Sequence, residues 1–172
     1  MDNRTEKFFN IIKARSDENE KSLHLLLESN CHALVGAIIR MELDSLIRVN
    51  DFNSESSVKK EVLLDNFFAG NRWSKTDRVM VESISSRIGW AKHIYEFGCA
   101  LIHLSPYHDW ATNDRISNLT NDKRCLIVKA IKEQQYDPTL TLNENFGFND
   151  LIRFAPLIFK KLRDNLLCEM RN

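Results

Sequence analysis

Two long stretches of this 172-residue chain repeat apolar residues every three or four positions, and neither contains a proline. Such a period places the apolar residues on one face of an α-helix. The whole chain has only five Gly and three Pro, too few for the many tight turns of a β-sandwich. We therefore predict an all-α fold. The two apolar stripes consist of Leu27, Cys31, Leu34, Ile38 and Met41, and of Ile84, Ile88, Ala91, Tyr95, Gly98 and Ile102.

Boundary residues divide the first half of the chain into three expected helices. A short amphipathic helix over residues 4–14 is followed by Ser16 and the acidic run "DENE", which is typical of a helix N-cap with acids in the first turn. We expect the long helix that starts there to reach about residue 49. A shorter helix over residues 58–70 ends at Gly70, a favoured C-terminal cap.

The second half is expected to hold three more helices. Thr76 or Ser74 begins a long one that ends at residue 104, because Pro106 disfavours helical geometry before it. Another runs from Thr120 or Asn121 to about residue 135. The last covers residues 150–170, with Pro156 as a kink or a restart.

Together these segments predict one domain over residues 1–172. Its expected architecture is an irregular four-helix bundle with an additional short N-terminal helix and long loops around 105–120 and 136–149. The composition, 43% hydrophobic and 28% charged, is ordinary for a soluble protein.

Charge and cysteine content indicate which partners and which cellular compartment to expect. The formal net charge is zero, with 12 acidic and 9 basic residues over 1–65 and 7 acidic and 10 basic over 115–172. This excess of positive charge near the C-terminus is smaller than that of a dedicated nucleic-acid-binding protein. The four cysteines are scattered, and no run of apolar residues fits a signal peptide or membrane span. We expect a cytoplasmic protein with reduced thiols and no membrane contact.

The stretch "EFGCALIHLSPYHDW" carries the most concentrated candidate chemistry. His93, Glu96 and His103 share one strip of an ideal helix, and His108 and Asp109 follow beyond the Ser-Pro step. Imidazole and carboxylate groups on one face suit acid-base catalysis. Alternatively, His103 and His108 bond to backbone groups left unpaired at the helix end.

A metal site is not predicted. The chain has no HExxH motif and lacks the ExxH pairs of a di-metal carboxylate bundle. No cofactor is expected. A metal-dependent helical-bundle enzyme using His93, His103 and His108 remains the weaker alternative.

Arginine and histidine together can cleave RNA without a metal. The imidazole takes the 2′-hydroxyl proton while the guanidinium stabilises the charge that develops on phosphorus. Arg87 precedes His93 by six residues but lies about 120° away on a straight helix. Arg163 precedes Asp164 on the last helix. Trp110 is the tryptophan nearest the histidines and a candidate for base stacking.

Nearly the whole chain resembles the HEPN superfamily of helical-bundle proteins, in particular an uncharacterised plasmid-borne bacterial branch. The resemblance is carried by "FGCALIHLSPYHDW", "LTNDKRCLIVKAIKEQQYD" and "FAPLIFKKLRDNLL". It implies a homodimer of toxin-antitoxin or defence type that cuts RNA, or a non-catalytic relative that binds RNA or a protein partner such as an antitoxin.

Active members of that superfamily carry Arg, a polar residue and then His on the last bundle helix. Arg163 and Asp164 match the first half, while positions 168–170 hold Cys, Glu and Met in place of His. The resemblance therefore implies an RNA-binding protein or a degenerate, metal-independent endoribonuclease. In the catalytic version His103 or His108 is the general base, Asp109 orients an imidazole, and Arg87 or Arg163 contacts phosphate. The alternative is a non-catalytic protein-protein interaction module.

Overall fold

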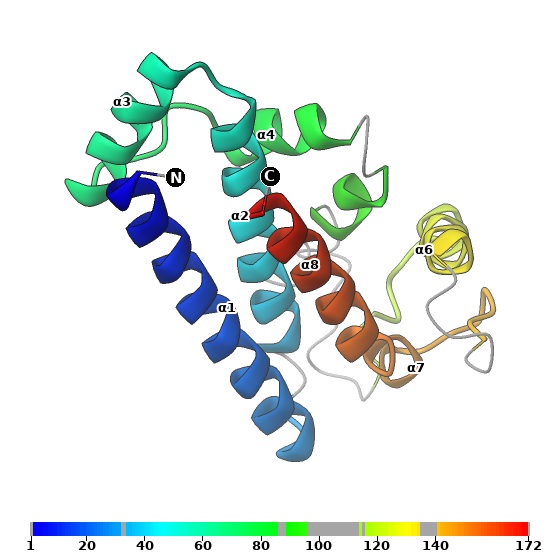
Figure 1. Ribbon diagram of the computed structural model, residues 1–172. Helices are drawn as coiled ribbons and strands as arrows, with labels where there is room; N and C mark the ends of the chain where they lie inside the picture. The colour runs from blue at the N-terminus through cyan, green and yellow to red at the C-terminus, as the bar shows by residue number, and fades with distance from the viewer. Residues whose placement is uncertain are drawn as a thin grey trace.

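The computed structural model describes residues 2–31, 34–85, 89–95, 114, 116–134 and 141–171, and every regular element within them is a helix. The expected all-α class is confirmed for this part of the chain. Figure 1 shows α1, α2 and α8 running side by side, with α3 and α4 around one end of α2. The helices are α1 (Asn3–Glu28), α2 (Val35–Ser54), α3 (Ser57–Phe68), α4 (Asp77–Ile84), α6 (Asn121–Gln134), α7 (Phe148–Ile152) and α8 (Ala155–Glu169).

The N-terminal helix is longer than expected, and Ser16 does not cap a second one. Asp2 is the N-cap of α1, and its carboxylate accepts from the backbone N–H groups of Arg4 and Thr5. Ser16 lies fully buried in the middle of α1, where its hydroxyl donates to the Glu42 carboxylate of α2 at 2.5 Å. The expected short helix over 4–14 is therefore wrong, because Ser16 has a tertiary partner and does not cap a helix start.

The expected long helix over 16–49 is in fact two helices. α1 ends at Glu28, and Asn30 follows with a φ of +56°. Asn tolerates this left-handed conformation better than most residues and often ends a helix in this way. The chain then re-enters a helix at Val35 and continues to Ser54.

The end of α3 and the start of α4 agree with the sequence prediction. The helix that follows Thr76 is shorter than predicted. Gly70 follows α3 with a φ of +71°, as expected of a C-terminal cap, and Thr76 is the N-cap of α4. α4 ends at Ile84, where the Ser85 hydroxyl donates to the Val81 carbonyl. Helical geometry returns over 90–95. The expected continuous helix from 76 is therefore interrupted, and its part beyond residue 95 lies outside the described residues.

The C-terminal helices follow the expected pattern. α6 begins at Asn121, and Pro156 lies in the first turn of α8, where its missing N–H costs nothing. A two-residue turn at 153–154 separates α7 from α8, so Pro156 marks a restart and not a kink. Of the two expected loops, residues 114, 116–120 and 141–147 are non-helical. The second expected loop extends too far, because residues 148 and 149 belong to α7, and the remaining positions lie outside the described residues.

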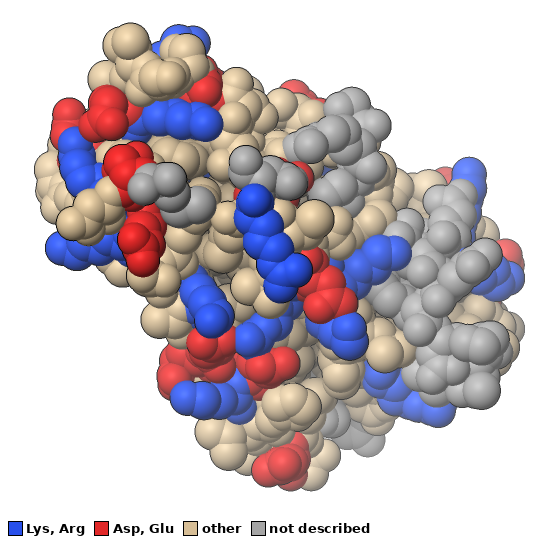
Figure 2. All heavy atoms as spheres, viewed as in Figure 1, with Lys and Arg blue, Asp and Glu red and all other residues tan. Residues whose placement is uncertain are grey.

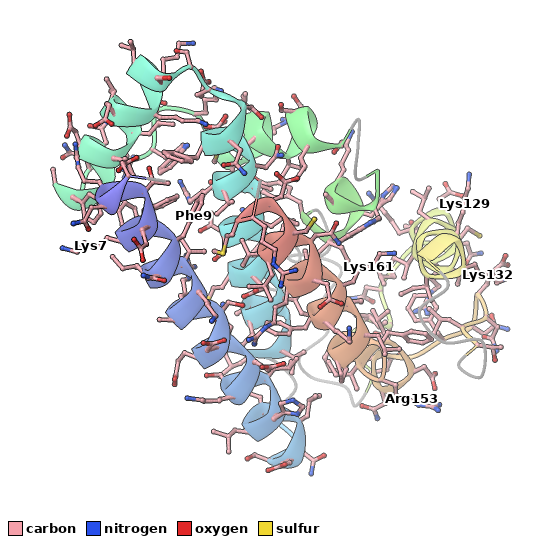
Figure 3. The ribbon with its side chains drawn as sticks, in the orientation of Figure 1. Lys7, Phe9, Lys129, Lys132, Arg153 and Lys161 are labelled. Carbon is pink, nitrogen blue, oxygen red and sulfur yellow. The ribbon has the colours of Figure 1, made fainter. Side chains whose placement is uncertain are left out.

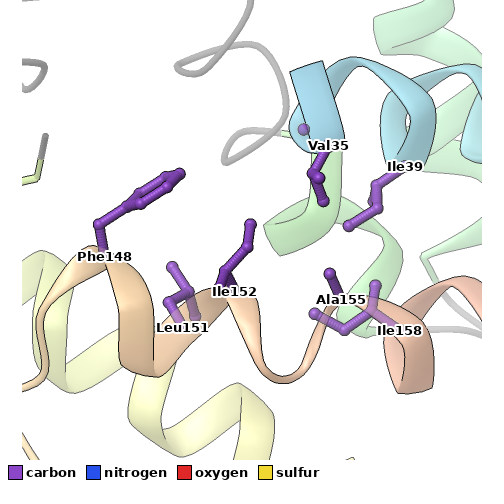
Figure 4. Close-up of a pocket in the computed structure, with 8 residues that line it drawn as sticks. Val35, Ile39, Phe148, Leu151, Ile152, Ala155 and Ile158 are labelled. Atoms are coloured by element: carbon purple, nitrogen blue, oxygen red, sulfur yellow. The ribbon is translucent and has the colours of Figure 1, made fainter. Parts of the chain in front are cut away.

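The core forms where α2 meets α1, α4 and α8. α2 carries the longest run of buried residues, and Phe8, Phe52, Phe67 and Trp73 form an aromatic cluster with it at the α3 end. Figure 4 shows a small apolar recess near the start of α2, lined by residues of α2, α7 and α8. Within the described part, no helix is long and apolar enough to cross a membrane.

Candidate functional site

His93 lies in the helical residues 90–95, which two neighbouring helices hold in place. Its side chain is half-buried. Trp90 packs beneath the Lys161 ammonium of α8, with 5.6 Å from Nζ to the ring centroid. On the other side, the Arg40 guanidinium of α2 lies 4.4 Å from the Tyr95 ring centroid. These cation–π contacts, together with buried Ala91, fix the orientation of the segment that presents His93.

Lys161 of α8 contacts this segment through the Trp90 ring. Burial lowers the pKa of its ammonium, because removal from water disfavours the charged form. The next arginine along α8, Arg163, points elsewhere. Two positions along a helix correspond to about 200°, so Lys161 can face Trp90 while Arg163 faces α1.

The guanidinium of Arg163 is engaged by two carboxylates of α1. Its Nη1 donates to Glu20 and its Nη2 to Asp17, and only 17% of its side chain is exposed. Cys168 is exposed near the end of α8, and Asn53 donates to the Glu169 backbone carbonyl. Polar contacts thus tie the middle of α8 to α1 and its C-terminal turn to α2.

The other predicted site residues fall outside the described part of the chain. These are Arg87, His103, His108, Asp109 and Trp110. Whether the imidazoles of His103 and His108 lie near that of His93 therefore remains a prediction.

The arginines of α1 and α2 are all paired with carboxylates. Arg4 bonds Glu61 and Asp65 of α3. The other three belong to one ladder of alternating charges across α1, α2 and α4. The ladder consists of Arg15, Asp44, Arg48, Asp77 and Arg40, with nitrogen–oxygen distances between 2.7 and 3.2 Å. These side chains join helices and are poorly placed to contact a ligand phosphate.

Some basic residues of α6, of α8 and of the turn at 153–154 are placed differently. Lys132 and Arg153 are exposed, and neither has an ion pair within the described part. Figure 3 shows Lys129, Lys132, Arg153 and Lys161 on the half of the molecule that holds α6 and α8, and Figure 2 shows more blue than red over that half of the face in view. We call these four residues the basic face. Individual residues were not identified from the sequence, although the positive balance after residue 115 signalled the region.

A buried polar cluster between α1 and α2 was not predicted from the sequence. Glu42 is completely buried, and it accepts from Ser16 and from the Asn19 amide at 2.9 Å. Ser16 and Asn19 are three residues apart, so both face α2. Among the described residues, no group of three or more His, Cys, Asp or Glu side chains could hold a metal ion.

No protein-family model matches the chain, no curated protein is significantly similar to it, and no solved structure resembles it at the significance required.

Proposed function

We propose that the protein is a cytoplasmic, HEPN-like helical-bundle protein of mobile-element defence or toxin type, and that it binds RNA as a homodimer. The observation that supports this proposal best is the basic face, whose four residues lie on α6, on α8 and in the turn at 153–154. Lys132 and Arg153 there are exposed and not neutralised by described carboxylates, in contrast to the arginines of α1 and α2. Ammonium and guanidinium groups at a surface attract the phosphates of a nucleic acid and displace its counterions.

The proposal predicts that two side chains of the basic face contribute to RNA affinity and to its salt dependence. In the double variant Lys132→Gln with Arg153→Gln, the slope of log K against log salt should fall by about 1.4 for single-stranded RNA, since each lost phosphate contact removes about 0.7. The measurement is fluorescence anisotropy with a labelled single-stranded 20-nucleotide RNA across a salt series.

A matched control removes two exposed cations elsewhere. Lys13 on α1 and Arg72 after α3 are exposed, with no ion pair in the described part. The Lys13→Gln with Arg72→Gln variant should bind like the unmodified protein. Equal losses in both variants, or no binding by the unmodified protein, would reject the basic face as the RNA surface.

In a catalytic version of the proposal, His103 or His108 takes the proton of a ribose 2′-hydroxyl. That oxygen attacks phosphorus, the bond to the 5′-oxygen breaks, and the leaving oxygen is protonated, which gives a 2′,3′-cyclic phosphate. The engagement of Arg163 by Asp17 and Glu20 favours Arg87 for the phosphate contact.

This version predicts cleavage of RNA in the presence of EDTA and its loss in the double variant His103→Ala with His108→Ala. The exposed His24 of α1 offers the control, since His24→Ala should cleave normally. Gel analysis of the cyclic-phosphate product gives the readout. A folded double variant with full activity would exclude both histidines as the general base. If the unmodified protein cleaves no RNA, the catalytic version is rejected and only RNA binding remains to be tested.

Two exposed valines of α3 favour a second function, that of a non-catalytic protein-interaction module. Val58 is 77% exposed and Val62 is 53% exposed, one turn apart on the same helix face. Apolar side chains gathered at a surface often mark a binding site. RNA binding that weakens with salt supports the first function, because phosphate contacts release counterions. If the protein shows no such salt-dependent RNA binding, the interaction module is favoured.

A further inference from the structure

A second recess lies at the opposite end of α2 from the apolar one, beside α3 and the connection to α4. Its volume is about 250 Å³. Both charged and apolar side chains contribute to it, and all of them belong to the described residues. The lining consists of Glu55, Lys59, Val62, Leu63, Ser74 and Lys75.

One wall of this pocket is a lysine held in a fixed position. The Lys75 ammonium donates to Asp51 at 2.6 Å and to Glu55. The Asp51 side chain is only 5% exposed and also accepts from the Trp73 indole at 2.8 Å. Hydrogen bonds to Asp51 and Glu55 raise the pKa of Lys75, so its ammonium stays charged at neutral pH.

The donor protons that remain in the pocket indicate which kind of ligand group fits here. Both oxygens of Asp51 and both oxygens of Glu55 already have a partner, the second oxygen of Glu55 being 3.2 Å from Lys59. An ammonium has three protons, so Lys75 keeps one and Lys59 keeps two. The exposed Ser74 hydroxyl adds a further donor. The pocket therefore offers spare donors, which suit an anionic acceptor.

Another part of the lining is apolar and branched. Val62 and Leu63 line it, and Val58 lies one helical turn from Val62. The volume equals that of about eight waters and falls below the roughly 300 Å³ of a pocket for a drug-sized molecule. A ligand of about eight non-hydrogen atoms would fill it.

We propose that this pocket binds a carboxylate carried on a short, branched aliphatic chain. The carboxylate contacts Lys75, Lys59 and Ser74, and the chain packs on Val62 and Leu63. Two sources supply this chemistry, a free aliphatic acid and the C-terminal residue of a peptide that ends in leucine or valine. The proposal concerns a site apart from the basic face and does not depend on RNA binding.

The test is an NMR titration of the full chain with three probes. They are 4-methylpentanoate, the peptide acetyl-Ala-Ala-Leu with a free carboxylate, and the same peptide as its C-terminal amide. We expect saturable shifts of the Trp73 indole N–H, which bonds the anchor of Lys75, with at least one of the two acids and not with the amide. Tighter binding of the peptide acid identifies a peptide C-terminus as the source, and binding of the small acid alone identifies a free acid.

Variants locate the binding in the pocket. Lys75→Met should weaken it by about tenfold or more, the usual effect of losing a charged hydrogen bond. Lys59→Gln and Ser74→Ala leave the Asp51–Lys75 pair intact and should each weaken binding several-fold, so the test holds even if Lys75→Met misfolds. Lys13→Gln on α1 should have no effect. Equal binding of the amide, no shift at about 10 mM acid, or unchanged binding by Lys59→Gln and Ser74→Ala would overturn the proposal.

Discussion

At the scale of single residues, the buried carboxyl group of Glu42 depends most on its hydrogen-bond partners. It is completely buried, and only neutral groups, the Ser16 hydroxyl and the Asn19 amide, bond to its carboxylate in the described part of the chain. Burying a carboxyl group is costly unless its oxygens are hydrogen-bonded, so these two hydrogen bonds must hold with good geometry. The cluster therefore fixes how α1 packs on α2.

Replacing Glu42 by Gln tests this role. The Gln carbonyl oxygen can still accept from Asn19, but its amide nitrogen can only donate. The Ser16 hydroxyl would have to turn to accept from that nitrogen, and its own proton would lose the acceptor that Glu42 provides. We expect a loss of about 1 to 3 kcal/mol in the free energy of unfolding, measured by urea denaturation. Glu28→Gln, at the exposed end of α1, should change it by less than about 0.5 kcal/mol.

A triple variant separates the value of the cluster from the cost of disrupting it. In Ser16→Ala, Asn19→Leu and Glu42→Leu together, every polar member is removed and no donor is left unpaired. We expect it to be more stable than Glu42→Gln alone, because apolar replacements of buried polar groups are often neutral. Stability of Glu42→Gln equal to that of the unmodified protein would show that the cluster does not hold the interface.

At the scale of the elements, the sequence predicted best where a boundary residue had one physical meaning. Gly70 after α3 and Pro156 at the start of α8 allow few conformations. The boundary at Gly70 was found, and a restart at Pro156 was one of the two alternatives that the sequence left open. Ser16 allows several, because a serine before acidic residues can cap a helix or face another helix. Asn30, with its left-handed φ, was equally ambiguous, and the break between α1 and α2 was missed.

The residues of the candidate site could likewise be predicted only in part from the sequence. A positive balance near the C-terminus is visible in the sequence, but the pairing of a cation with a carboxylate or a ring depends on the tertiary structure. Nothing in the sequence indicated that Arg163 faces Asp17 or that Lys161 covers Trp90. Which cations remain at the surface for a ligand could be decided only from the packed helices.

At the scale of the whole molecule, the described chain is held together unevenly. α1, α2, α4 and α8 meet in the core, to which α6 contributes Val128 and Ile131. Arg124 of α6 adds a polar tie to the non-helical segments beside that helix. The Arg124 guanidinium donates to the carbonyls of Ile116, Leu119 and Phe146 and lies 5.2 Å from the Phe146 ring centroid. A single planar side chain thus joins residues before α6 to residues after it.

This arrangement predicts local unfolding around α6 when Arg124 is changed. In Arg124→Lys the charge remains, but one ammonium cannot reach three carbonyls as a planar guanidinium does. We expect amide hydrogen exchange over residues 116–134 and 141–147 to become about tenfold faster, with protection in α2 and α8 unchanged. Lys123→Gln, at the neighbouring position of α6, serves as the control. Equal acceleration in α2 and in α6 would mean that the described chain opens as one unit, and that Arg124 stabilises the whole core and not only the α6 region.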